Sequence, residues 1–126
     1  MPDDLTKHFL EKSHAALKAA QDNIDCNNNE TVINRSYYAI FYAVSALACK
    51  YNFATSKHSQ LMGWFNKKFI YEESVFDDKM LKIYNDIFNY RQRSDYNAMY
   101  VPDTALVQDI LSDAKLFVEK IETFIS

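Results

Sequence analysis

The sequence contains very few of the residues that turn a chain sharply: among 126 residues there are one glycine and two prolines. A β-sheet protein of this length needs many tight turns, and glycine and proline are the residues that favour them. The scarcity therefore argues against a sheet protein and predicts helices. A single glycine also excludes a glycine-rich phosphate-binding loop, because such a loop needs several.

An excess of positive charge is also missing, since 14 Lys and Arg stand against 17 Asp and Glu for a net charge of −3. Nucleic-acid-binding proteins usually carry a basic excess, so any such contact here must come from a local patch. Cys26 and Cys49 form no CxxC pair, and His8 and His14 are six residues apart and do not share a helix face. We therefore expect free thiols, no metal site and no cofactor.

No apolar run approaches the ~20 residues that a membrane span needs, and the first residues lack the pattern of a signal peptide. These absences predict a cytoplasmic protein that does not enter a membrane. Apolar residues nevertheless make up 48% of the chain, with nine Phe and nine Tyr. A chain of this length can bury a core as one domain over residues 1–126, and we expect part of the aromatic surface to serve an interface.

Apolar residues recur at helical spacing in five segments. The predicted helices run over about 4–26, 30–51, 57–71, 78–96 and from 104 to the end. Polar residues that can cap the later helices precede them: Asn29, Ser56, Asp77 or Asp78, and Asp103 or Thr104 after Pro102.

The helix lengths predict the architecture. Four helices have ~19–23 residues, or roughly 29–35 Å, and the third is about two-thirds as long. We predict an all-α fold: an antiparallel four-helix bundle of up-down-up-down topology, with the shorter third helix crossing between helices 2 and 4. The start of helix 2 and the end of helix 4 then lie at the same end of the bundle. Arg35 and the segment RQRSDY, 91–96, are predicted to be neighbours.

The second helix has apolar residues on two opposite faces. One face carries Ile33, Tyr37, Ile40, Val44, Leu47 and Tyr51, and the other carries Arg35, Tyr38, Tyr42, Ala46 and Cys49. Such a helix lies either at the centre of the domain or under a partner chain. The tyrosines of the second face, Tyr38 and Tyr42, therefore either pack in the core with their hydroxyls near the surface or form a dimer face.

Arg35 needs a carboxylate or an anion if it is buried, and Asp95 is the candidate partner. Arg91 continues the apolar stripe of the fourth helix, so it points inward, and Asp95 follows four residues later. We expect a cluster of Arg35, Arg91, Asp95 and Tyr96. The cluster is either a structural ion pair that sets helix register, a site for an anion or nucleotide, or a catalytic centre.

Lys57 and His58 open the third helix. A histidine there can meet an anion at the helix N-terminus, where backbone amides are free. The alternative is that Ser56 caps the helix while Lys57 and His58 are solvated.

Four segments together resemble one family: NRSYYAIFYAVSALA (34–48), KHS (57–59), RQRSDY (91–96) and DAKLFVEKI (113–121). They resemble the HEPN superfamily (higher eukaryotes and prokaryotes nucleotide-binding), most of all its branch of small prokaryotic proteins, over about residues 5–125. The resemblance implies a helical bundle that is usually a homodimer. It also implies pairing with a small nucleotidyltransferase, often in toxin–antitoxin modules.

Many members of that superfamily are metal-independent ribonucleases with an Arg-x4–6-His motif, and this chain departs from it. No histidine stands at those distances after Arg35, Arg91 or Arg93. His58 is the remaining candidate for the base that removes the 2′-hydroxyl proton.

Three hypotheses for function follow. The first is a HEPN-like partner protein whose cluster either binds a nucleotide or RNA phosphate or docks a nucleotidyltransferase. In the binding form Arg35 and Arg91 contact the phosphate and Asp95 orients them. Tyr38 and Tyr96 then stack on the ligand or hydrogen-bond to it. The second is a ribonuclease toxin. In this hypothesis Arg91 stabilises the phosphorane, Asp95 orients Arg91, and His58 or Tyr96 transfers protons. The third is a purely structural dimeric module that uses the Tyr38 and Tyr42 face.

Overall fold

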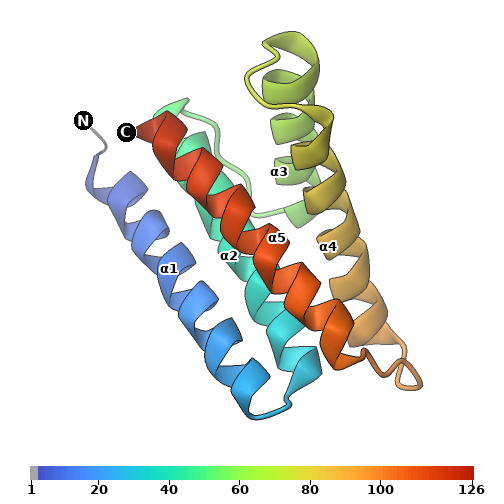
Figure 1. Ribbon diagram of the computed structural model, residues 1–126. Coiled ribbons are helices and arrows are strands. Elements are labelled where there is room, and N and C mark those ends of the chain that lie inside the picture. The colour runs from blue at the N-terminus through green and yellow to red at the C-terminus, as the bar shows by residue number, and fades with distance from the viewer. Residues whose placement is uncertain (1–2) are drawn as a thin grey trace.

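The computed structural model describes residues 3–126, and its regular elements within that range are all helices (Figure 1). This confirms the predicted all-α class. The elements are α1 (Asp4–Asp25), α2 (Asn29–Lys50), α3 (His58–Phe65), the π-helix η1 (Asn66–Glu72), α4 (Asp78–Tyr96) and α5 (Thr104–Ile125). Within the described range no helix is both long and apolar enough to cross a membrane.

The long helices α1, α2, α4 and α5 alternate in direction along the bundle (Figure 1). α2 is central and contacts α1, α4 and α5. After α2 the chain turns back along it, so that α3 begins part-way along the bundle rather than at its end. α3 and η1 then run beside α4 in the opposite direction (Figure 1). This return places the start of α3 against the side of α2.

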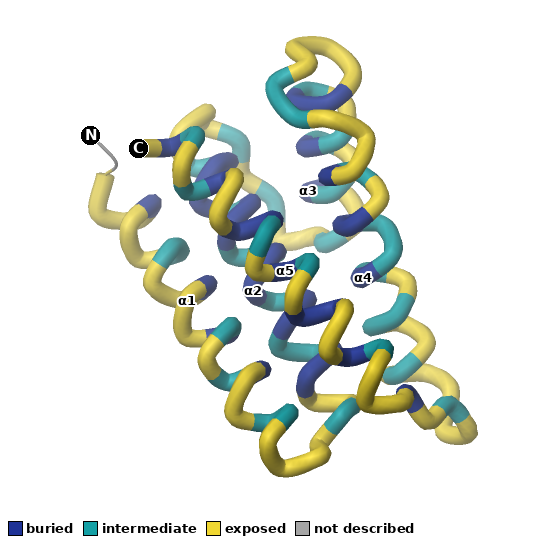
Figure 2. Tube along the Cα trace, in the orientation of Figure 1, coloured by how far each residue is buried: buried dark blue, intermediate teal, exposed yellow. Residues whose placement is uncertain are grey.

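Burial follows the predicted faces of α2 (Figure 2). The residues of its first face from Ile33 to Leu47 are fully buried, and Ala39, Ala43 and Ala46 are buried as well. Small side chains allow neighbouring helices to approach closely. Ser13 of α1 is fully buried, and its hydroxyl donates to the Ala39 carbonyl at 2.7 Å. The largely apolar contact between α1 and α2 thus contains a buried hydrogen bond.

Asparagine takes the place of glycine at two helix ends. Asn27 and Asn52 adopt positive φ angles of 60° and 57° just after α1 and α2. Asparagine tolerates this left-handed conformation better than most residues, and the two ends close with the Schellman pattern of hydrogen bonds. The longer-range bonds of that pattern run from Asn28 N to Asn23 O and from Phe53 N to Ala48 O, each at 2.9 Å.

The predicted caps are partly correct. Asp77 and Asp103 cap α4 and α5 through their side chains. Asn29 is not a cap but the first residue of α2, and its amide donates to the Pro102 carbonyl at 3.0 Å. Ser56 is not a cap either: Lys57 holds that position without a side-chain bond.

The third helix differs from the prediction of one α-helix over 57–71. It is α-helical only to Phe65 and continues as a π-helix to Glu72. Phe69 and Ile70 of the π-helix are both buried. Apolar spacing fits either winding, which is why the sequence does not reveal the change.

Candidate functional site

The start of α2 and the end of α4 lie at the same end of the bundle, as predicted (Figure 1). The guanidinium groups of Arg35 and Arg91 both lie over the ring of Tyr38, at 5.1 and 5.4 Å from its centroid. Arg91 also lies 5.0 Å from the ring centroid of Tyr37. His58, from the start of α3, contacts Tyr37, Tyr38 and Arg91. We call Arg35, Tyr37, Tyr38, His58 and Arg91 the arginine–tyrosine site.

Arg91 is mostly buried, with 20% of its side chain exposed. Its Nε lies 3.0 Å from Oδ2 of Asp95, one helical turn further along α4. The contact is short enough for an ion pair but is not aligned as a hydrogen bond, so the buried Nε lacks a hydrogen-bond partner among the described residues. Arg91 is therefore held electrostatically, with donor capacity left over.

Arg35 does not pair with Asp95, and that expectation is wrong. Its Nε and Nη2 donate to Oδ1 of Asn34 at 3.0 and 2.7 Å. Asp95 lies on the same helix as Arg91, within reach at the i,i+4 spacing, and it pairs there instead. Among residues 3–126 no carboxylate lies within ion-pair distance of Arg35. Of the two guanidinium groups, Arg91 is therefore paired with a carboxylate and Arg35 is not.

His58 reaches the site, which the sequence did not indicate. Its Nδ1 lies 2.9 Å from the Tyr37 hydroxyl and 3.4 Å from Nη1 of Arg91. Its ring stacks on Phe41 with centroids 4.3 Å apart. Burial, and then the positive charge of Arg91, lowers the pKa of His58 from its usual value. The imidazole is therefore neutral at neutral pH.

Tyr37 belongs to this site although the sequence analysis placed it in the core stripe. It is fully buried, and only its hydroxyl contact with His58 distinguishes it from a packing residue. Burial raises the pKa of Tyr37, with the nearby Arg91 opposing the shift. The phenol therefore stays protonated and can donate. No spacing in the sequence marks this contact, because it depends on where α3 begins.

Two predicted members of the site lie apart from these contacts. Tyr96, at the end of α4, is 83% exposed. Lys57 is exposed immediately before α3. Neither side chain has a recorded contact with the arginine–tyrosine site, so neither helps to build it.

The second face of α2 is half-buried at Tyr38 and Tyr42. Tyr42 stacks on Phe9 of α1 with centroids 6.3 Å apart, and Lys12 lies 5.2 Å above its ring. The face is aromatic and continuous with the arginine–tyrosine site through Tyr38. Its part in dimer formation stays a prediction.

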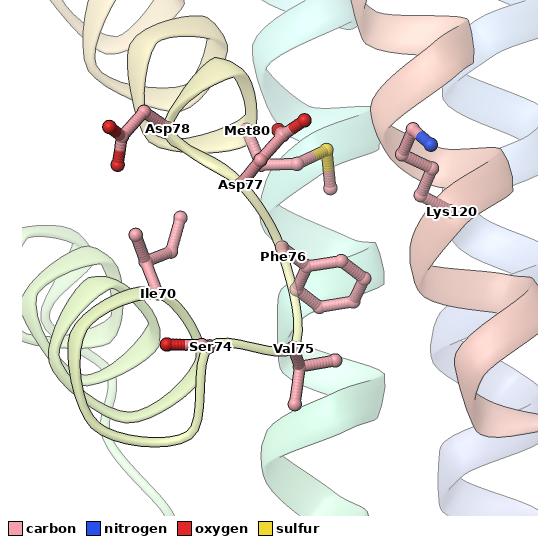
Figure 3. A pocket seen from close by; sticks show the side chains of 8 residues that line it. All are labelled: Ile70, Ser74, Val75, Phe76, Asp77, Asp78, Met80 and Lys120. Atoms are coloured by element: carbon pink, nitrogen blue, oxygen red, sulfur yellow. The ribbon is translucent and has the colours of Figure 1, made fainter.

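A surface hollow of about 530 Å³ lies elsewhere, between the η1–α4 loop and α5 (Figure 3). Phe76, Asp77 and Lys120 are among the residues that line it. It adjoins the start of α4, whereas the arginine–tyrosine site lies toward the end of that helix. In the part of the chain that the structure describes, no group of three or more His, Cys, Asp or Glu side chains is placed to hold a metal.

Comparison with protein families gives a match to the HEPN domain over residues 6–124. The chain belongs to the HEPN family. A UPF0332 protein of Thermotoga maritima is 35% identical over 98% of this chain and 92% of that protein. Two proteins of Methanocaldococcus jannaschii, both named "Putative toxin", are 27% and 25% identical. They cover 93% and 94% of this HEPN chain, which spans 79% and 92% of their lengths.

The chemistry of the site in this HEPN chain follows from its charges. It offers two guanidinium groups, a neutral imidazole and the half-buried ring of Tyr38, with the Asp95 carboxylate beside Arg91. Guanidinium groups bind phosphate oxygens through paired hydrogen bonds, and tyrosine rings stack on nucleic-acid bases. The arrangement suits a phosphorylated ligand with a planar group better than a metal or an apolar small molecule.

Proposed function

We propose that this HEPN chain is the helical member of a toxin–antitoxin-type module, and that its arginine–tyrosine site binds the phosphate of a nucleotide or of RNA. The single observation that carries the proposal is the placement of Arg35 and Arg91 over one tyrosine ring with only Asp95 to balance them. Two guanidinium groups around one ring concentrate positive charge, which a bound anion would neutralise. Two relatives that carry the word toxin in their names support the kind of module.

Each residue has a defined part in this proposal. Arg35 and Arg91 contact phosphate oxygens, and Asp95 orients Arg91. Tyr38, and the exposed Tyr96 at the end of α4, stack on a base or hydrogen-bond to it. Lys57 adds positive charge beside His58.

Binding to labelled single-stranded RNA and to labelled ATP in EDTA tests the proposal. Arg35→Ala should weaken binding of at least one of these ligands, while Arg93→Ala is the matched control. Arg93 lies on α4 like Arg91, but its guanidinium rests on Tyr90 and Tyr100, outside the site. Equal losses in both variants would mean that only general surface charge matters. If the wild type binds neither ligand, the cluster is a structural feature.

A second function, a metal-independent ribonuclease toxin, is favoured by the 3.4 Å approach of His58 to Arg91. Arg91 would stabilise the charge on the phosphorane, Asp95 would orient Arg91, and His58 or Tyr96 would transfer protons. RNA cleavage that persists in EDTA and disappears in both His58→Ala and Arg91→Ala would establish this activity. Binding without cleavage would leave the accessory role.

Protein partners form the remaining part of the proposal. The half-buried face at Tyr38 and Tyr42 supports a homodimer, and the neighbouring arginine–tyrosine site is where a nucleotidyltransferase would dock. Tyr42→Glu places a charge in the centre of that face, so sedimentation should show monomers if the dimer forms there. A purely structural module predicts this change and no measurable effect on any nucleic-acid ligand.

A further inference from the structure

We propose that Tyr37 is a positioning residue that holds His58 as the neutral tautomer with its proton on Nε2, so that His58 offers a hydrogen-bond donor to a bound anion. The inference about the donor rests on the proposed function, because it assigns His58 a task in the same site. The inference about the tautomer concerns the free protein and can be tested without a ligand.

The argument begins at Nδ1 of His58. This atom faces the Tyr37 hydroxyl at 2.9 Å and Nη1 of Arg91 at 3.4 Å. A guanidinium group carries only donors and stays charged at all ordinary pH values. A proton on Nδ1 would point toward the Arg91 donor and would leave the Tyr37 hydroxyl hydrogen without this acceptor. Nδ1 therefore presents its lone pair, and in the neutral imidazole the proton lies on Nε2.

Of the two contacts at Nδ1, the one from the Tyr37 hydroxyl is the shorter and stronger. Its ring is fully buried, and no acceptor other than His58 is recorded for its hydroxyl among the described residues. A buried hydroxyl without a bond costs ~1–3 kcal/mol. The hydroxyl hydrogen therefore points at Nδ1. The longer Arg91 contact adds a second donor on the same side.

No carboxylate is placed to stabilise the other tautomer of His58 within the described residues. The groups that face the imidazole are the rings of Tyr37, Tyr38 and Phe41 from α2 and the guanidinium of Arg91 from α4. Within residues 3–126 no carboxylate bonds the His58 ring, so no anionic acceptor favours a proton on Nδ1. Nε2, on the opposite edge of the half-buried ring, has no hydrogen-bond partner in that range and remains free to donate.

The tautomer separates the two candidate functions. A base that removes a 2′-hydroxyl proton must present an unprotonated nitrogen to the substrate. In His58 that nitrogen is engaged by Tyr37 and Arg91, and the free edge carries the proton. The geometry therefore favours anion binding by His58 over proton removal.

Long-range proton–nitrogen NMR correlation on the ¹⁵N-labelled full chain, at a pH above the titration of His58, tests the tautomer. The His58 signals are assigned by their loss in His58→Gln. We expect Nε2–H in the wild type. In Tyr37→Phe the ratio of Nε2–H to Nδ1–H should fall about five-fold, the factor that a net hydrogen bond of about 1 kcal/mol represents.

Tyr84→Phe is the matched control, because Tyr84 is also fully buried but its hydroxyl has no bond within the described residues. It should leave the His58 signals unchanged. Nδ1–H as the major wild-type form would overturn the proposal. So would a ratio in Tyr37→Phe equal to that of the wild type.

The donor role is tested with a labelled single-stranded oligoribonucleotide. His58→Gln places an amide N–H near the position of Nε2, whereas His58→Asn places one near Nδ1. Glutamine should keep most of the affinity, and asparagine should lose roughly ten-fold or more, as expected for one hydrogen bond to a charged group. Equal losses would refute the donor role. A wild type that does not bind would refute the proposed function, while the NMR result still decides the tautomer.

Discussion

The charge balance at Arg91 makes a sharp prediction about RNA binding. Arg91→Ala removes one guanidinium from the site and also leaves the Asp95 carboxylate, 34% exposed, without its partner. The lost hydrogen bond to a charged group corresponds to ~1.5–3 kcal/mol, or roughly 10- to 100-fold in affinity. The unpaired carboxylate then repels the phosphate. We therefore expect a larger loss in Arg91→Ala than in Arg35→Ala.

Two further results should accompany this loss. Adding Asp95→Asn to Arg91→Ala should restore part of the affinity, because it removes the repelling charge. The slope of log K against log salt should become less steep by about 0.7 for each phosphate contact removed. Arg93→Ala should leave the slope nearly unchanged, since its guanidinium lies on Tyr90 and Tyr100.

Fluorescence anisotropy across a salt series, with circular dichroism to confirm folding, measures both quantities. An exposed i,i+4 ion pair contributes only ~0.3–0.5 kcal/mol to stability. Arg91→Ala also removes packing of a mostly buried side chain on Tyr37 and Tyr38, so the circular dichroism spectrum must match that of the wild type before affinities are compared. An unchanged salt slope in Arg91→Ala would refute the reasoning. Further loss of affinity on adding Asp95→Asn would refute it as well.

Three predictions concern stability. Ser13→Ala removes the buried bond to the Ala39 carbonyl and should cost about 1 kcal/mol, or ~3–6 °C in thermal unfolding. Gly63→Ala should stabilise by ~0.5–1 kcal/mol in urea titration, because Gly63 is helical and a Cβ there meets nothing within 4 Å; a loss would contradict this account. His58 has a lowered folded pKa. The unfolded chain therefore binds more protons, and stability should fall as pH drops below about 6.5 toward the folded pKa. His58→Gln should flatten that part of the pH curve, and an unchanged curve would show that other groups dominate.

Much of the fold could be predicted because it depends on local patterns. α4 begins and ends at the predicted residues, Asp78 and Tyr96. Asp77 caps it as expected because an aspartate immediately before a helix bonds the free amides nearby. The predicted caps Asn29 and Ser56 are wrong because the same residue types also occur inside helices or make other bonds. Nothing in the apolar spacing distinguishes the π-helical winding after Phe65.

The site could be predicted only in part. Inward orientation of Arg91 and its nearness to Arg35 followed from the helical period and the order of the helices. The predicted pairing of Arg35 with Asp95 is wrong because Asp95 pairs with Arg91. The sequence puts both arginines near Asp95, and only the distances in the structure show which one pairs. The sequence offers His58 as a candidate for the site and puts Tyr37 in the core stripe, and no spacing in it brings the two together.

The sequence by itself determined the helices, their apolar faces and the end of the bundle where charge collects, because these depend on residues close together along the chain. Only the tertiary structure decided that the 51–57 segment returns along α2 and delivers His58 to Tyr37 and Arg91. The contacts that join His58 to the site span 21 and 33 residues. Contacts between residues so far apart depend on the path of the whole chain.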